Sequence, residues 1–188
     1  MTAAQLQFQG HEAIVVICDG LPYSEREIFD LPKIRSYKSF IVAQTDVQDE
    51  YKQATSMGFR RIANYIFGGN DKNIQIPMTA PVISTSPAIN PDFYEVMFFM
   101  PSNFSLKSLP NPNLESVKLV KLQIKKVAAL KFGGWATKEN CLKYQKRLEN
   151  WLQEKSIKTD SGYLVAQYNS PWAIPPFRKN EILVRLID

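Results

Sequence analysis

Residues that could do covalent or metal chemistry are scarce in this sequence of 188 residues. It contains one histidine, His11, and two cysteines, Cys18 and Cys141. Zinc sites take most of their ligands from Cys and His, and a His-dependent catalytic triad would have to use His11. Glu95 and Glu181 occupy similar positions in two parts of the chain, but no obvious nucleophile or base accompanies them. We therefore expect neither a metal site nor an enzyme.

The overall composition is that of an ordinary soluble globular protein. Hydrophobic residues make up 45% of the chain and charged residues 22%, with a formal net charge of +5. No apolar run approaches the roughly 18–20 residues of a membrane helix. Residues 1–10 lack the charged and apolar regions of a secretory signal. Because two cysteines cannot build a disulfide framework, we expect a cytoplasmic protein.

Lysines gather around two predicted strands in the second half of the chain: Lys118, Lys121, Lys125, Lys126 and Lys131. The sequence has neither a groove-reading helix nor aromatic RNA-binding motifs to accompany them. We interpret these lysines as solvated strand faces and edge protection, and we expect no nucleic-acid partner.

The order of predicted elements occurs twice. Hydrophobic patterning and turn residues predict a strand, a helix and two strands at residues 38–45, 49–67, 73–85 and 94–100. Gly68 and Gly69 follow the helix, as is typical of a helix C-terminus. The same order returns at residues 126–132, 137–155, 163–169 and 180–187, with Thr137 as the helix N-cap. We interpret the chain as a duplicated unit.

One such unit would bury too little surface to be stable alone. The two units are therefore expected to join their strands into one curved sheet or barrel, with a helix from each on the outside. This predicts an α+β single domain over residues 31–188, with pseudo-repeats at about 31–101 and 115–188. Residues 1–30 are interpreted as an N-terminal extension packed on the barrel.

The first predicted helix has two apolar faces when its residues are spaced at about 100°. The face that we assign to the sheet holds Tyr51, Ala54, Gly58, Ile62, Tyr65 and Ile66. A second stripe holds Ser56, Phe59, Arg60, Ala63 and Phe67, where a surface helix usually carries charges. This stripe could form one wall of a groove for a flat apolar ligand with an acidic edge, or it could be buried under the later Pro-rich loop. The pattern leaves both alternatives open.

The second predicted helix has a single core stripe and a charged outer face, so we expect it to be structural. The stripe consists of Cys141, Tyr144, Leu148, Trp151 and Leu152.

Three ordered motifs stand out along the chain: Ile76-Pro77-Met78-Thr79-Ala80-Pro81-Val82, Phe132-Gly133-Gly134 and Arg178-Lys179-Asn180-Glu181-Ile182. In this order they resemble the signature, a mid-chain element and the closing motif of the SOUL/haem-binding protein family, and the resemblance extends over about residues 33–187. It implies a distorted antiparallel β-barrel with two flanking helices, in agreement with the duplication inferred above.

The resemblance also implies a ligand and a site. Members of the family bind haem and other tetrapyrroles in an open hydrophobic cleft between the first helix and the loop before the last strand. The second stripe of the first helix coincides with one wall of that cleft. The expected ligand-binding residues are Ser56, Phe59, Arg60, Ala63, Asn64, Phe67, Tyr168, Trp172 and Ala173.

The sequence departs from the family where iron and carboxylate ligands are expected. Ser36 stands where one branch has a histidine, and Asn64 and Ala173 stand where some members have lysines. Because serine is a poor haem ligand, we expect haem or another porphyrin to bind non-covalently without a His axial ligand. Met78 and Tyr37 are alternative iron ligands, although such residues in strands more often belong to the core.

The sequence therefore predicts a non-enzymatic protein that binds haem or a related tetrapyrrole as a carrier, buffer or sensor. The alternative is an effector-sensing or protein-interaction module related to gyrase-inhibitor-like domains, without physiological haem binding. The expected partner is a small molecule, and a monomer is the favoured oligomeric state.

Overall fold

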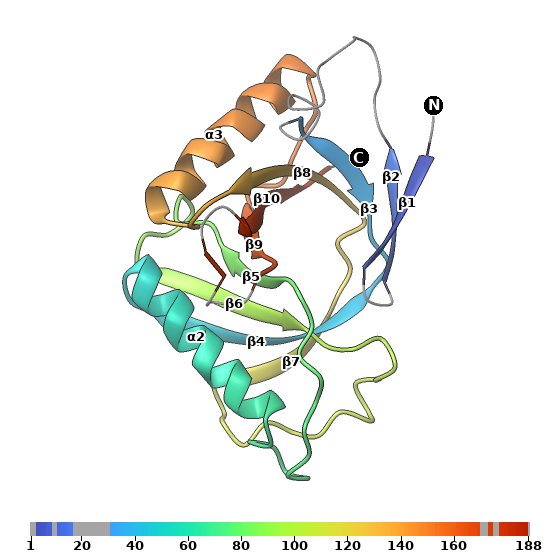
Figure 1. Cartoon of the computed structure of the whole chain (residues 1–188), viewed down its shortest axis with the longest axis vertical. Coiled ribbons are helices and arrows are strands. Elements are labelled where there is room, and N and C mark those ends of the chain that lie inside the picture. Colours follow the sequence, from blue (N-terminus) through green and yellow to red (C-terminus); the bar gives the residue numbers. More distant parts are fainter. Residues whose placement is uncertain (1–2, 9–10, 17–30, 170–172, 175–176, 188) are drawn as a thin grey trace.

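A single curved antiparallel sheet organises the chain, with strands in the order β1-β2-β3-β8-β10-β9-β5-β6-β4-β7 (Figure 1). The computed structural model describes residues 3–8, 11–16, 31–169, 173–174 and 177–187. The strands are β1 (Ala3–Phe8), β2 (His11–Val16), β3 (Lys33–Ser36), β4 (Phe40–Gln48), β5 (Val82–Thr85), β6 (Phe93–Phe99), β7 (Val117–Leu122), β8 (Lys126–Gly133), β9 (Leu164–Gln167) and β10 (Lys179–Arg185). The helices are α2 (Tyr51–Ile66) and α3 (Lys138–Glu154).

The element order predicted from the sequence is present in both halves of the chain. The first half contains β4, α2, β5 and β6, and the second contains β8, α3, β9 and β10. In the sheet, the trio β8-β10-β9 joins the trio β5-β6-β4 where β9 pairs with β5. Each half therefore contributes its long first strand, its last strand and a short strand at the junction. The ancestral duplication itself stays a prediction.

The expected barrel is wrong in one respect, because the sheet is not closed. Strand β7 pairs with β4 at one end of the strand order, whereas β1 lies at the other. The strand β3, next to β8, pairs on its second side with β2 of the β1–β2 hairpin. Its edge is thus occupied by the hairpin and is not available to β7. The α+β class is confirmed, with an open curved sheet in place of a closed barrel.

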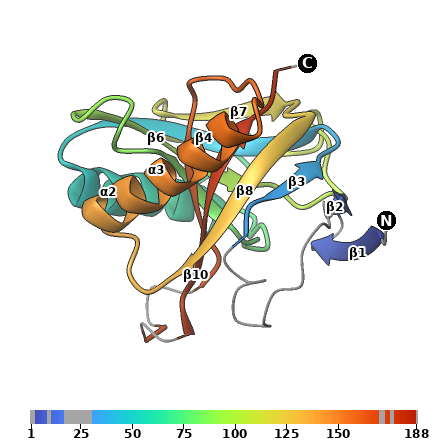
Figure 2. The same cartoon turned by 90° about the horizontal axis from the view of Figure 1, so that it is seen from above.

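Both helices cover the same side of the sheet. One buried cluster joins Tyr51 and Ala54 of α2 with Cys141 and Leu148 of α3, over strand residues that include Val165. Figure 1 and Figure 2 both place the helices on the side of the molecule away from β1 and β3. The burial of a shared core explains why neither half would be stable alone.

The predicted sheet-facing side of the first helix is confirmed. The buried residues of α2 are the six that helical periodicity assigned to the sheet: Tyr51, Ala54, Gly58, Ile62, Tyr65 and Ile66. Gly68 follows the helix with a φ of 111°, a backbone conformation that favours glycine. In the second helix, the Thr137 side chain accepts a hydrogen bond from the backbone N–H of Asn140, so the predicted N-cap is also confirmed.

The strand predicted at residues 73–85 is mostly wrong. Only Val82–Thr85 forms a strand, β5, and the preceding residues are irregular. Pro77 and Pro81 cannot donate to a strand ladder, and the Asn70 side chain stabilises a turn in its place. Its amide nitrogen donates to the carbonyls of Tyr65 at 3.0 Å and Ile74 at 2.8 Å. A strand not predicted at all, β3, lies beside β8.

A buried ion pair fixes β3 to β10 on the concave side of the sheet. Both nitrogens of the Arg35 guanidinium fork donate to Glu181, with N–O distances of 2.8 Å and 2.6 Å. The Arg35 and Glu181 side chains are only 1% and 2% exposed. The Tyr168 hydroxyl donates to the same carboxylate at 2.6 Å. This bidentate geometry compensates for the cost of removing both charges from water.

We predict that Gly58→Ala destabilises the protein. A Cβ at position 58 would lie 2.4 Å from Cγ2 of Val96, because α2 lies close to β6 there. Overpacking of this kind costs about 1–3 kcal/mol, more than the helix propensity gained by adding Ala. Urea unfolding followed by circular dichroism measures the change in the free energy of unfolding. Ser56→Ala, on the exposed face of the same helix, is the control; equal stability of both variants would contradict the close approach.

We also predict that Glu181→Ala lowers the free energy of unfolding by about 3–5 kcal/mol, because it leaves the Arg35 guanidinium buried without its carboxylate. The matched control is Asp160→Ala, which removes an exposed ion pair with Arg185. That loss should be much smaller, since water screens exposed pairs. Similar losses for the two variants in the same denaturant titration would contradict this role for the buried pair.

Candidate functional site

A large cleft lies on the helix-covered side of the molecule, with a volume of about 1360 Å³. Its walls come from α2, from the turn between β8 and α3, from residues 78–80 and from residues after β9. Segments far apart in the sequence thus meet around it. The volume exceeds that of most small-molecule pockets, which suits a large ligand.

The α2 wall is formed by part of the predicted stripe. Ser56, Phe59 and Arg60 all line the cleft. Ser56 and Arg60 are exposed, whereas Phe59 is half-buried and packs on Phe98 with ring centroids 5.2 Å apart. Phe59 therefore belongs both to the core, through one part of its ring, and to the cleft. Its core contact is with β6, whereas the second alternative left open by the sequence was burial under the later Pro-rich loop.

Only one of the other described residues predicted to bind the ligand lines the cleft. Tyr168 lines the cleft, but Ala63, Asn64, Phe67 and Ala173 are outside its lining. Phe67 is 61% exposed at the end of α2. The backbone carbonyl of Asn64 accepts a hydrogen bond from the N–H of Gly69 at 2.8 Å, within the turn that ends the helix. Trp172 lies outside the described residues.

The wall opposite α2 contains a pair that sequence reasoning missed, Trp135 and Arg178. The Arg178 guanidinium carbon lies 3.7 Å from the centroid of the Trp135 ring, and its Nε donates to the carbonyl of Ala173 at 2.8 Å. Burial lowers the pKa of Arg178 from its usual range, but an arginine keeps its charge at neutral pH. The stacked pair thus presents a fixed cation beside an aromatic ring at the edge of the cleft.

The position of this pair follows from two of the motifs noted in the sequence. Gly134, which has a φ of 81°, turns the chain between β8 and Trp135. The Asn180 side chain donates to the carbonyl of Gly134 at 2.9 Å, so it connects the Gly-Gly turn to the start of β10. Arg178 lies two residues before Asn180. The signal that could have located the pair was therefore the co-occurrence of the Phe-Gly-Gly and Arg-Lys-Asn-Glu-Ile motifs.

Charged side chains of both signs surround the cleft. The basic ones are Lys52, Arg60, Lys138 and Arg178, and the acidic ones are Glu50, Asp92 and Glu139. Arg60 lies on α2 and Arg178 near the start of β10, so cations are present on two walls. Acidic groups of a ligand could contact either wall while its apolar part covers Phe59.

The residues lining the cleft offer few donors for an iron. Among the described residues, the lining includes Met78, Tyr51 and Tyr168 but neither histidine nor cysteine. Burial raises the pKa of both tyrosines well above the usual value, which disfavours the phenolate that would bind iron. Tyr168 already donates its proton to Glu181, and Met78 is 42% exposed. Among the described lining residues, aromatic and cationic side chains are thus more prominent than potential iron donors.

The remaining metal candidates lie elsewhere. Ser36 is an exposed residue at the end of β3, and neither Ser36 nor Tyr37 lines the cleft. Within the described residues, no group of three or more His, Cys, Asp or Glu side chains could hold a metal ion. In the same part of the chain, neither helix is long and apolar enough to cross a membrane.

Comparison with known proteins places this cleft in a family context. Residues 21–185 match the family described as SOUL heme-binding protein. The chain is 31% identical over 150 residues to heme-binding protein 1 of Mus musculus, covering 74% of this chain and 76% of that protein. It is 24% identical over 170 residues to heme-binding protein 1 of Xenopus laevis, covering 87% and 83%.

A solved structure of a hydrolase from Listeria innocua shares the fold. Its TM-score is 0.60 at 11% identity, over 87% of this chain and 96% of that one. This likeness concerns the fold alone. The family match, in contrast, spans most of the sequence and includes both the α2 wall and the Trp135–Arg178 wall of the cleft. The chain belongs to the SOUL heme-binding protein family.

Proposed function

We propose that this protein binds haem or a related tetrapyrrole non-covalently in the large cleft, as a carrier, buffer or sensor, and catalyses no reaction. The observation that carries the proposal is the position of the cleft. It lies between α2 and the segment before β10, with Phe59 on one wall and the Trp135–Arg178 pair on another. Its family membership and the names of its relatives support haem as the first ligand to test.

The residues that line the cleft fit different parts of such a ligand. Phe59 and Trp135 are aromatic side chains that would contact the porphyrin ring. Arg60 and Lys52 lie on α2, and Arg178 is fixed by stacking on Trp135. These cations would pair with the propionates. A bound haem would supply iron chemistry, but the protein's own residues only bind and orient the ring.

The cysteine that the structure describes, Cys141, is not suited to catalysis. Burial raises the pKa of the Cys141 thiol to about 11, and the residue is fully buried. A thiol of this kind is not a nucleophile at neutral pH. The proposal also keeps the cytoplasmic location and the monomeric state expected from the sequence.

Substitution of the α2 wall tests the site. We predict that Phe59→Asp weakens hemin binding by about 30-fold or more, because contact with a buried aromatic side chain corresponds to about 2 kcal/mol. The matched control is Phe67→Asp, on the same helix but outside the cleft, which should bind as the unmodified protein does. Titration with hemin, followed by the Soret band and by tryptophan fluorescence, measures both.

Because Phe59 also packs on Phe98, a second variant separates binding from folding. Ser56→Trp inserts a bulky side chain at an exposed position of the cleft wall and should reduce hemin affinity while leaving the circular dichroism spectrum unchanged. The proposal would be abandoned if the protein shows no saturable one-to-one hemin binding at micromolar ligand. If Phe67→Asp alone weakens binding, the site lies beyond the end of α2.

The scarcity of iron ligands gives a separate prediction. We expect iron-free protoporphyrin IX to bind with an affinity within about threefold of hemin, since the ring and propionates carry the interaction. Met78→Leu should leave the Soret maximum of the hemin complex unchanged. Fluorescence quenching and absorbance titrations provide the two affinities. A preference of about 30-fold or more for hemin, lost in Met78→Leu, would identify an axial ligand and contradict this assignment.

A further inference from the structure

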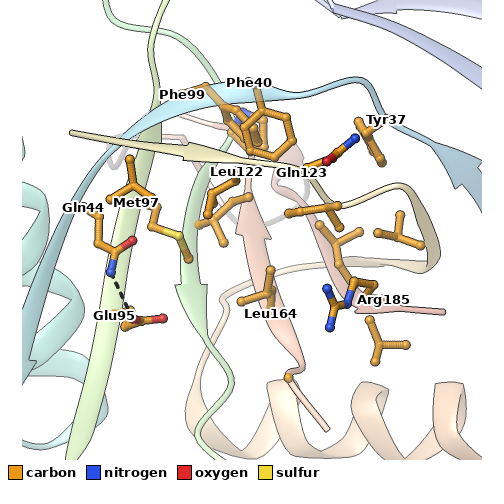
Figure 3. Close-up of a pocket in the computed structure, with 18 of the residues that line it drawn as sticks. Tyr37, Phe40, Gln44, Glu95, Met97, Phe99, Leu122, Gln123, Leu164 and Arg185 are labelled. Atoms are coloured by element: carbon orange, nitrogen blue, oxygen red, sulfur yellow. Dashed lines mark hydrogen bonds between the residues drawn. The ribbon is translucent and has the colours of Figure 1, made fainter. Parts of the chain in front are cut away.

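A second, smaller cavity lies on the concave face of the sheet, opposite the helices. Its volume is about 570 Å³, within the range of pockets that hold small organic ligands. Figure 3 shows side chains from several strands converging around it, among them Phe40 and Gln44 of β4, Glu95 and Met97 of β6, and Leu164 of β9. The signature motif contributes Thr79, Ala80 and Pro81 to its lining, but the haem proposal assigns no ligand to this cavity.

The lining is apolar except at a few positions. The buried cluster around it includes Phe40, Ile83, Met97 and Leu183, with Phe99 packed against them. The Phe40 and Phe99 rings meet edge to face, with centroids 4.7 Å apart. A cavity bounded by such residues favours the apolar body of a ligand.

One carboxylate interrupts this apolar lining. Glu95 is half-buried, and one of its oxygens accepts a hydrogen bond from the Gln44 side-chain amide at 3.0 Å (Figure 3). The other two charged lining residues, Asp160 and Arg185, form an ion pair with each other. No ion pair to Glu95 is found in the described part of the chain, so the neutral Gln44 amide is the partner that the structure gives it.

A second carboxylate lies next to Glu95. In the β4–β6 register, Asp46 is directly opposite Glu95, and like charges in this position repel each other. Burial, and to a smaller extent Asp46, raise the pKa of Glu95 above its usual range. A positive charge placed in the cavity would relieve both the desolvation and the repulsion.

We propose that the concave-face cavity is a second small-molecule site, which binds an apolar organic cation with its charge against Glu95. Phe40 and Phe99 lie four residues along β4 and β6 from Gln44 and Glu95, about 13 Å away. Together with Tyr37, they would therefore contact the apolar body of the ligand, not its charge. An organic anion would be repelled by the same carboxylate. The two cavities share Thr79, Ala80 and Tyr168 in their linings, but Phe59 and the Trp135–Arg178 pair line only the large cleft.

The test compares three ligands that share one ring system. They are the cation (1-naphthylmethyl)trimethylammonium, the anion 1-naphthaleneacetate and the neutral 1-naphthalenemethanol. Isothermal titration calorimetry on the full chain should give one-to-one binding of the cation, at least about tenfold tighter than either of the others. Equal or tighter binding of the anion would overturn the proposal.

Two variants locate the binding. Glu95→Gln keeps the shape of the side chain and removes its charge, so affinity for the cation should fall by about tenfold or more. Glu154→Gln, at the exposed end of α3, is the matched control and should bind normally. Leu122→Trp fills the cavity from a half-buried lining position and should abolish binding. Unchanged affinity in Glu95→Gln would contradict the role of the carboxylate.

A further arm separates this site from the haem cleft. Ser56→Trp, which obstructs the cleft, should leave cation binding intact, and saturating hemin should not displace the cation. Displacement by hemin, or loss of cation binding in Ser56→Trp, would place the cation in the cleft and overturn the proposal. Failure of hemin binding with cation binding retained would instead contradict the proposed function alone.

Discussion

The buried Arg35–Glu181 ion pair holds together parts of the molecule that the chain connects only indirectly. Arg35 lies on β3 and Glu181 on β10, which β8 separates in the sheet. Glu181 also accepts the hydroxyl proton of Tyr168, just beyond the end of β9. Tyr168 lines both the large cleft and the concave-face cavity. One carboxylate thus positions a residue that lines both cavities. The bidentate geometry with Arg35 offsets the cost of burying this carboxylate.

The alternation of side chains along the strands explains why the sheet has two different cavities. On β10, Ile182 and Val184 face the helices, whereas Leu183 belongs to the cluster on the concave side. On β6, Val96 and Phe98 pack under α2, and Met97 faces the concave cavity. A period of two therefore gives each strand one structural face and one face toward the second cavity. Because the sheet remains open and curved, the concave face keeps a hollow between its apolar side chains.

Local charge, and not the net charge of +5, determines what each cavity can bind. Exposed lysines more than about 8–10 Å away are screened by salt and contribute little inside a pocket. The cleft has basic residues on two walls, together with acidic ones, and suits a ligand with acidic groups. The concave cavity has Glu95 with Asp46 opposite it. Under the two proposals above, a basic protein would have one site for an acidic ligand and another for a cation.

The sequence by itself determined the local features of this protein. Helical periodicity identified the sheet-facing residues of α2, and Thr137 was recognised as a cap from its type and position, because both depend on neighbours within a few residues. The motifs identified the family, and helical periodicity identified the stripe with Phe59. Tertiary structure decided the rest. The sheet stays open because β3 pairs with β2. The path of residues 73–81 depends on the Asn70 side chain together with the prolines. Arg178 met Trp135, and Glu95 faced an apolar cavity, only through the folding of distant segments onto one another. Such contacts cannot be recognised from the periodicity of the sequence, since the energy that favours them comes from interactions between residues far apart in the chain.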